Sequence, residues 1–216
     1  SPDWVRSGLP GYPAGGGDDL NMTLAGLPDL RTERPRAVGL PPLLAQKDNS
    51  GARHMAEARV VDYLIQWKSD WLRRFGIDGI RADTVKHVEK EAWLALRHAA
   101  EQARADWVRA NPQAPTAGTP LWMVGEVWAN GTFADDYPEY GFDALINFDY
   151  QSDHALPLAL CPARAEEVYQ RYQAAVAEQP GFQPMSYISS HDTRLFFGSF
   201  GDEGLQRRAA NTLLLL

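Results

Sequence analysis

Three acidic side chains come just after short apolar stretches of the sequence, where strands are expected to end. Asp83 follows residues 77–82, Glu126 follows residues 121–124, and Asp192 follows residues 186–189. Helical patterns separate these stretches, so strands and helices alternate and the strands are predicted to run parallel. Because the carboxyl ends of parallel strands share one edge of a sheet, the three carboxylates are predicted to converge.

The residue types around these acids favour the chemistry of a glycosidase. Two carboxylates roughly 5 Å apart suit a retaining mechanism, in which one attacks the anomeric carbon and the other transfers a proton. Arg81 lies on the same strand face as Asp83 and would keep that carboxylate charged, as a nucleophile requires. Apolar neighbours of Glu126 favour the protonated carboxyl of a general acid. Asp192, next to His191, is placed to bind sugar hydroxyls and to stabilise a positively charged transition state.

Each part of this pattern also has a plainer interpretation. Arg81 and Asp83 could form a structural ion pair, and Glu126 could be a solvated residue at a strand end. The pair His191 and Asp192 also resembles the metal-binding pair of phosphohydrolases, but that site needs several further histidines. The remaining histidines, two of which fall on predicted helices, are His54, His87, His98 and His154.

Composition excludes several classes of protein. The chain has 216 residues, of which 44% are hydrophobic, so it is long enough to bury a sizeable core. Its net charge is −7 and it has no basic run, which argues against nucleic acid as a partner. No apolar run is long enough to cross a bilayer, so no membrane partner is expected. Cys161 is the one cysteine, which excludes an internal disulfide and a metal site built from cysteines.

The patterns predict an alternation of elements along most of the chain. Helices are predicted at 53–75, 88–110, 163–178 and 203–213, and strands at 77–82, 121–124, 144–148 and 186–189. In the first helix an apolar stripe runs from Val60 through Leu64, Trp67 and Trp71 to Phe75, and Gly76 ends the helix. Residues 1–51 are rich in Pro and Gly and are predicted to be irregular.

Four strands are too few to close an eight-stranded barrel. The chain also ends on an apolar run at 213–216 that has no polar cap. We therefore expect the sequence to be part of a longer protein.

Four short motifs together resemble the α-amylase family, glycoside hydrolase family 13. Residues 79–87 (GIRADTVKH) resemble its second conserved region, residues 125–128 (GEVW) the third, and residues 190–192 (SHD) the fourth. Residues 27–29 (LPD) resemble a short motif near the end of the family's inserted domain B. The four motifs occur in the family's order, and the residues that flank them look most like those of bacterial periplasmic α-amylases.

The resemblance implies an α/β fold that is part of a TIM (β/α)8 barrel, roughly strands 4–7 with their helices. Residues 1–51 would then be the remnant of the irregular domain B. Residues 52–216 would be the partial catalytic barrel, truncated at both ends. The resemblance also implies a periplasmic or secreted protein, and we expect a monomer.

The resemblance assigns roles to residues at the three strand ends. Asp83 matches the family's nucleophile, Glu126 its general acid/base and Asp192 its transition-state stabiliser. Arg81 matches the arginine that orients the nucleophile, and His191 matches a histidine that binds the sugar at the cleavage subsite.

Two further matches concern the leaving-group side and a structural metal. Lys86 and His87 match residues on the leaving-group side, a pair that is usual in members acting on α-1,4 bonds. Asp29 and the backbone carbonyl of His87 match ligands of the family's structural calcium ion, which prefers hard oxygen ligands. The family's first conserved region, which carries another calcium ligand, is absent, and Ser190 stands where many members carry Asn.

The activity implied is retaining hydrolysis of α-1,4-glucosidic bonds in starch or maltodextrins. An α-glucanotransferase of the same family shares all three acids and is the alternative among enzymes. A fragment that binds glucan without catalysis is the alternative from a different class.

Overall fold

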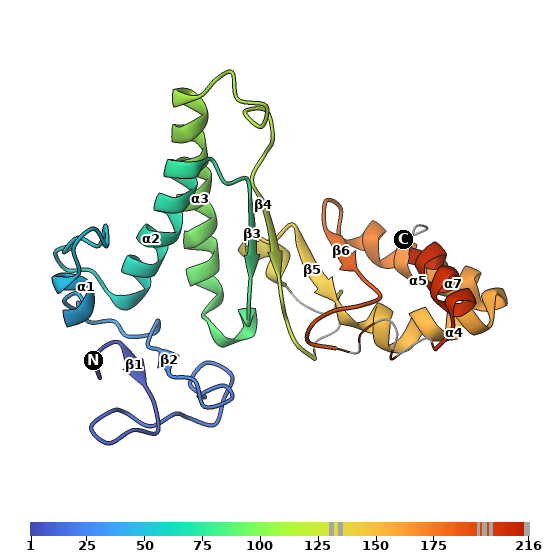
Figure 1. The fold of residues 1–216 in the computed structure, drawn as a ribbon, viewed down its shortest axis with the longest axis horizontal. Coiled ribbons are helices and arrows are strands. Elements are labelled where there is room, and N and C mark those ends of the chain that lie inside the picture. Colours follow the sequence, from blue (N-terminus) through green and yellow to red (C-terminus); the bar gives the residue numbers. More distant parts are fainter. Residues whose placement is uncertain (130–131, 134–135, 194, 196–197, 199–200, 214–216) are drawn as a thin grey trace. The chain divides into compact units, whose positions relative to one another are not determined.

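The computed structural model describes residues 1–129, 132–133, 136–193, 195, 198 and 201–213, in two compact units (Figure 1). The first unit contains Ser1–Ile80 and Thr84–Trp122, and the second contains Arg81–Asp83 and Met123–Leu216. This division differs from the predicted boundary between residues 51 and 52. That boundary concerns membership of domain B and stays a prediction.

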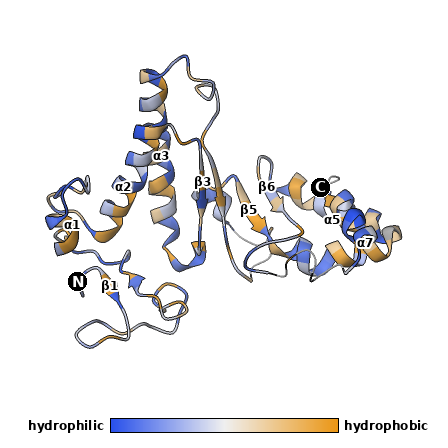
Figure 2. Ribbon diagram, in the orientation of Figure 1, coloured by the Kyte–Doolittle hydropathy of each residue, from blue (hydrophilic) through white to orange (hydrophobic). Residues whose placement is uncertain are grey.

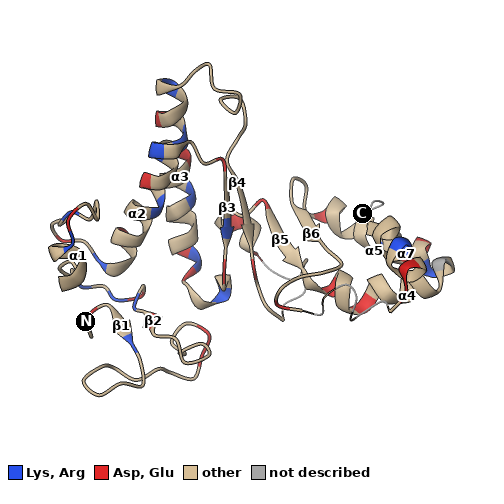
Figure 3. Cartoon of the chain, in the orientation of Figure 1, with Lys and Arg blue, Asp and Glu red and all other residues tan. Residues whose placement is uncertain are grey.

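Two long helices form the frame of the first unit. They are α2 (Val60–Phe75) and α3 (Lys90–Ala110), which pack side by side. Both show hydrophobic and hydrophilic positions in alternation along their length (Figure 2), and both carry charges of either sign (Figure 3). Leu72 of α2 packs on Ala100 and Ala103 of α3. As predicted, α2 ends at Gly76, which has a φ of 68° and where an added Cβ would overlap the Trp107 ring.

The start and the predicted stripe of α2 need correction. The helix begins at Val60 rather than at residue 53, because the Asp62 carboxylate accepts the Arg59 N–H at 2.8 Å and fixes the first turn there. Trp71 and Phe75, which the stripe assigns to the core, are both 57% exposed. The stripe fails because the two halves of the helix pack on different neighbours, so the buried face rotates along the helix.

The loop-rich start of the chain packs on the first half of α2. It contains β1 (Val5–Arg6), β2 (Asp29–Leu30) and a short helix, α1 (Pro42–Gln46). The two strands pair antiparallel. Trp4 is buried and stacks on Trp67 of α2, with ring centroids 5.7 Å apart. The irregular region is therefore anchored by an aromatic core rather than by an extended sheet.

A four-stranded sheet has the order β3-β4-β5-β6. The strands are β3 (Gly79–Ala82), β4 (Trp122–Gly125), β5 (Ala144–Asn147) and β6 (Gln183–Ser186). The pairs β4–β5 and β5–β6 are parallel, as the alternation of elements predicts. The last strand lies at Gln183–Ser186 rather than at 186–189. Ile188 instead packs against a helical cluster, and its carbonyl accepts a hydrogen bond from Gln151 at 3.0 Å.

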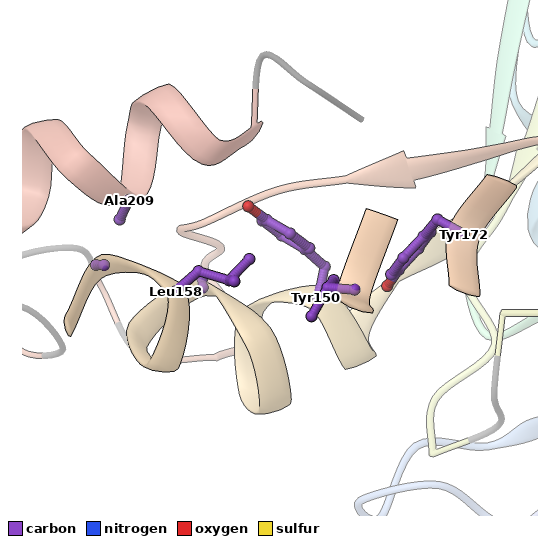
Figure 4. Packing of buried hydrophobic residues seen from close by; sticks show 7 residues of the cluster. Tyr150, Leu158, Tyr172 and Ala209 are labelled. Carbon is purple, nitrogen blue, oxygen red and sulfur yellow. The ribbon is translucent and has the colours of Figure 1, made fainter. Parts of the chain in front are cut away.

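Helices of the second unit enclose a separate hydrophobic cluster (Figure 4). Tyr150, Leu158, Tyr172 and Ala209 are buried together there. The elements that contribute are η3 (Tyr150–Ala155), α4 (Leu156–Leu160), α5 (Ala165–Glu178) and α7 (Glu203–Leu213). The patterns predict α5 and α7 but not the π-helical turn and short helix that precede α5. Of the predicted terminal apolar run, residues 214–216 lie outside the described part.

Short 3-10 turns complete the description of the chain. They are η1 (Val85–His87), η2 (Tyr137–Tyr140) and η4 (Pro162–Arg164). None of the described helices combines the length and the apolar character that crossing a membrane requires.

Candidate active site

Two of the predicted acids follow neighbouring strands. Asp83 comes directly after β3 and Glu126 directly after β4. The backbone N–H of Glu126 donates to the carbonyl of Ala82 at 2.9 Å, which places the two strand ends next to each other. Their environments differ, since the Asp83 side chain is 65% exposed whereas Glu126 is only 6% exposed. Two carboxyl groups in such different environments can take different roles in catalysis.

Arg81 binds the Asp83 carboxylate, as their spacing on a strand predicts. Its Nη1 lies 2.8 Å from Asp83 Oδ1, and both side chains are open to solvent. An exposed ion pair contributes only about 0–1 kcal/mol to stability. The pair therefore adds little to stability, and the orienting role of Arg81 stays a prediction.

The third predicted acid belongs to the same unit, beyond β6. Asp192 Oδ2 lies 2.9 Å from Nε2 of His191, so the two residues contact each other directly. The backbone N–H of Asp192 donates to Ser190 Oγ at 3.2 Å, which fixes the turn that carries both. Both side chains are accessible to a ligand.

The hydroxyl of Tyr187 is affected by the charges of Asp192 and Glu126, and sequence reasoning did not single this residue out. Burial raises the pKa of the Tyr187 hydroxyl, the Thr193 hydroxyl lowers it in part, and the charges of Asp192 and Glu126 raise it further. Both carboxylates therefore lie within electrostatic reach of one phenol group, and that phenol stays protonated at neutral pH. The Tyr187 and Thr193 hydroxyls do not meet hydrogen-bond geometry with any residue that the structure describes. The sequence offers no signal here, because an aromatic residue near a strand end is usually core.

Three aromatic rings contact one another in the segments that follow the strands. The Phe148 ring lies 4.9 Å from that of Trp128 and 5.8 Å from that of Tyr187, both in edge-to-face geometry. They follow β5, β4 and β6 respectively. Trp128 keeps 46% of its surface exposed, so a flat apolar face is available to a ligand.

Asn147 holds the strand ends in register. Its Oδ1 accepts from Thr132 Oγ1 at 3.1 Å and from the Tyr150 N–H at 3.2 Å. Its Nδ2 donates to the hydroxyls of Tyr172 at 2.8 Å and Ser186 at 2.9 Å. The side chain is fully buried and all four of its hydrogen-bonding positions are used. The segments after β4 and β5, the end of β6 and helix α5 are thereby tied at one point.

Lys86 and His87 belong to the first unit, where both contact Asp19. Lys86 Nζ lies 3.6 Å from Asp19 Oδ1, and His87 Nδ1 lies 2.7 Å from the Asp19 carbonyl oxygen. This arrangement ties η1 to the loop at residues 18–22. Their predicted role on the leaving-group side stays a prediction.

Asp29, the predicted calcium ligand, lies in a charged cluster of the first unit. Its Oδ2 accepts a hydrogen bond from Arg6, whose other nitrogen binds Glu33 at 2.6 Å. Burial raises the pKa of the Asp29 carboxyl, Arg6 lowers it in part, and the charges of Glu33 and Glu89 raise it further. Within the described residues, no three His, Cys, Asp or Glu side chains are grouped as metal ligands. A cation at Asp29 would thus depend on backbone oxygens as well, which calcium accepts.

Comparisons with known proteins place the chain among the α-amylases. No family model matches the chain. The periplasmic α-amylase of Escherichia coli (strain K12) is 44% identical over 195 residues, covering 90% of this chain and 28% of that protein. A cyclomaltodextrinase of a Bacillus species is 28% identical over 147 residues, covering 67% of this chain and 24% of that protein. The chain therefore spans about a quarter of the length of these curated relatives.

Solved structures show the same relationship at the level of fold. An Anoxybacillus α-amylase matches with a TM-score of 0.61 at 23% identity, covering 98% of this chain and 39% of that structure. The α-amylase from H. orenii matches with a TM-score of 0.60 at 19% identity, covering 96% of this chain and 40% of that structure. The predictions of an α-amylase sequence and of a partial TIM barrel are confirmed. The roles of the individual site residues stay predictions.

Proposed function

Because the chain is homologous to an α-amylase over 90% of its length, we propose that the protein hydrolyses α-1,4-glucosidic bonds of starch or maltodextrins with retention of configuration. The observation that carries the proposal is the pairing of a buried Glu126 with an exposed, arginine-bound Asp83 at neighbouring strand ends. A substrate bound across these strand ends would meet both groups.

In the first step, a carboxylate oxygen of Asp83 attacks the anomeric carbon while the bond to the leaving oxygen breaks. Glu126 gives its proton to that oxygen, which leaves as the hydroxyl of the released glucan. In the second step, Glu126 removes a proton from water, the water oxygen bonds to the anomeric carbon, and the ester to Asp83 breaks. Arg81, which binds the Asp83 carboxylate, orients it for the attack.

Asp192 and His191 fit the remaining role beside the reacting sugar. Their side chains are open to solvent and in contact, so together they offer oxygen and nitrogen atoms to sugar hydroxyls. The negative charge of Asp192 also opposes the positive charge that develops on the sugar ring in the transition state. The exposed face of Trp128 suits stacking against a neighbouring sugar unit.

We also propose a structural calcium ion held by Asp29 and the backbone carbonyl of His87. Asp29 has one carboxylate oxygen bound to Arg6, which leaves the other as a hard oxygen donor. Both carboxylate oxygens of the nearby Glu89 are buried and accept no hydrogen bond from a described residue, which is an environment that a cation would satisfy. When bound, the ion would supply stability rather than chemistry. The proposed compartment, in line with the Escherichia coli relative, is the periplasm or the cell exterior.

The test compares Glu126→Gln with Glu139→Gln in the complete protein, using soluble starch and maltoheptaose as substrates. Glu139 is an exposed acid of the same unit, so its substitution controls for the loss of one charge. Glu126→Gln should lose hydrolysis by a factor of at least about 100, because a general acid contributes about 10²- to 10⁴-fold to the rate. Glu139→Gln should match the wild-type rate.

Unchanged turnover in Glu126→Gln, with Glu139→Gln as active as the wild type, would reject the assignment. The products formed from maltoheptaose separate hydrolysis from transfer. Chains longer than the substrate would show that the protein is a glucanotransferase.

A further inference from the structure

The carboxylate of Glu89 has no use in the fold as the structure shows it. Both of its oxygens are buried, and neither accepts a hydrogen bond from any residue within the described ranges. A buried carboxylate that lacks a partner is strongly unfavourable, so native proteins rarely retain one without a cation or donor nearby. Glu89 therefore needs an explanation of its own.

Capping of the adjacent helix does not supply that explanation. Glu89 is the N-cap residue of α3, a position where an acidic side chain normally accepts backbone N–H groups of the first turn. Here the side chain makes no capping hydrogen bond. The burial of the carboxylate is therefore not explained by helix capping.

The arginines that bind Asp29 and Glu33 do not bind Glu89. Arg6 binds Asp29 and Glu33, and Nε of Arg31 lies 3.7 Å from Glu33. Neither guanidinium group contacts Glu89. The charge of Glu89 nevertheless contributes to the raised pKa of Asp29, which belongs to the same unit.

We propose that Glu89 is a ligand of the calcium ion, together with Asp29. The inference rests on the calcium site proposed above, and it adds a carboxylate that the resemblance does not assign. The second oxygen of Asp29, the carboxylate of Glu89 and the carbonyl of His87 are all hard oxygen donors of the kind calcium prefers. A divalent cation between Asp29 and Glu89 would neutralise the unpaired charge. It would also join the start of α3 to β2 of the loop-rich region.

The test measures calcium binding by isothermal titration calorimetry on the complete, calcium-depleted protein, with glucan absent. Glu89→Gln keeps the shape of the side chain and removes its charge. Glu91→Gln is the matched control, because Glu91 is an exposed acid in the first turn of the same helix. Glu89→Gln should weaken calcium binding by a factor on the order of ten or more, since ligand charge sets calcium affinity. Glu91→Gln should bind as the wild type does.

A second variant, Asp29→Asn, separates the two proposals. If Asp29→Asn loses calcium binding while Glu89→Gln keeps wild-type affinity, the calcium site stands and the role of Glu89 is wrong. If the wild-type protein binds no calcium, both proposals are wrong. Circular dichroism of each variant confirms that it is folded, and the calcium-induced rise in melting temperature gives a second readout that should fall in parallel with affinity.

Discussion

Replacing Asn147 should destabilise the protein through lost hydrogen bonds rather than lost volume. The side chain is fully buried and makes four hydrogen bonds. A typical buried hydrogen bond contributes about 1 kcal/mol net, and a buried group left without a partner costs about 1–3 kcal/mol. The hydroxyls among its partners can turn to other acceptors, but the N–H of Tyr150 cannot. We therefore expect Asn147→Ala to lower the free energy of unfolding by about 3–5 kcal/mol.

Two further variants distinguish the cause of that loss. Asn147→Leu fills the same space without hydrogen-bonding atoms, and Asn211→Ala removes an exposed asparagine from α7 of the same unit. Urea-induced unfolding followed by circular dichroism gives the change in free energy from the transition midpoints. Asn147→Leu should lose about 3 kcal/mol or more, and Asn211→Ala should stay within about 0.5 kcal/mol of the wild type. If Asn147→Leu were as stable as the wild type, the hydrogen-bond network would not be what stabilises the strand ends.

Three other predictions concern alkaline pH, a buried arginine and chelation. Burial raises the pKa of Tyr172 to about 12. The unfolded chain therefore loses that proton first, and this group should lower the free energy of unfolding by about 2–3 kcal/mol between about pH 10 and 12, a contribution that Tyr172→Phe should remove from the total loss. Arg104 is buried and donates hydrogen bonds to the carbonyls of Gly76 and Thr116. Arg104→Ala should therefore lower the free energy of unfolding, measured in urea, by about 3 kcal/mol. Arg109 is exposed, so Arg109→Ala should lower it by less than about 1 kcal/mol. Removal of calcium by a chelator should lower the melting temperature measured by calorimetry, and added calcium should restore it, because the ion binds the folded state. An unchanged melting temperature would count against the calcium site.

The parts of the fold that the sequence predicts well are those with a strong local pattern. The helix end at Gly76 was predictable because a helix that stops needs a left-handed residue, and glycine adopts that conformation without strain. The exposure of Trp71 was not predictable, since the pattern shows which residues are apolar but not which neighbour covers each half of the helix. The last strand was predicted at 186–189 but lies at Gln183–Ser186, and the prediction was wrong for a similar reason. Ile188 is apolar, but it packs on helices rather than continuing the strand.

The residues of the candidate site also differ in whether a local sequence pattern predicts them. Asp83 and Glu126 could be placed at neighbouring strand ends from the sequence because each directly follows a strand, and parallel strands end at one edge. Asp192 comes several residues after the end of β6, so its convergence with the other two acids stays a prediction. Tyr187 and Glu89 were not predictable, because their environments come from residues distant in the chain. The charges of two acids that follow different strands act on Tyr187, and the carboxylate of Glu89 is buried although the sequence predicts the residue only as part of the first turn of a helix.

The most direct test of the account is to identify which residue forms the covalent bond to the sugar. A fluorinated α-glucosyl fluoride forms the glycosyl ester and slows its hydrolysis, so the modified protein can be digested with trypsin and analysed by mass spectrometry. The three acids fall on separate tryptic peptides, since cleavage follows Arg81 and Lys86 around Asp83, Arg109 and Arg164 around Glu126, and Arg171 and Arg194 around Asp192. The account predicts one glycosyl group on the pentapeptide 82–86. A glycosyl group on either of the other two peptides, or hydrolysis with no trapped ester, would contradict it.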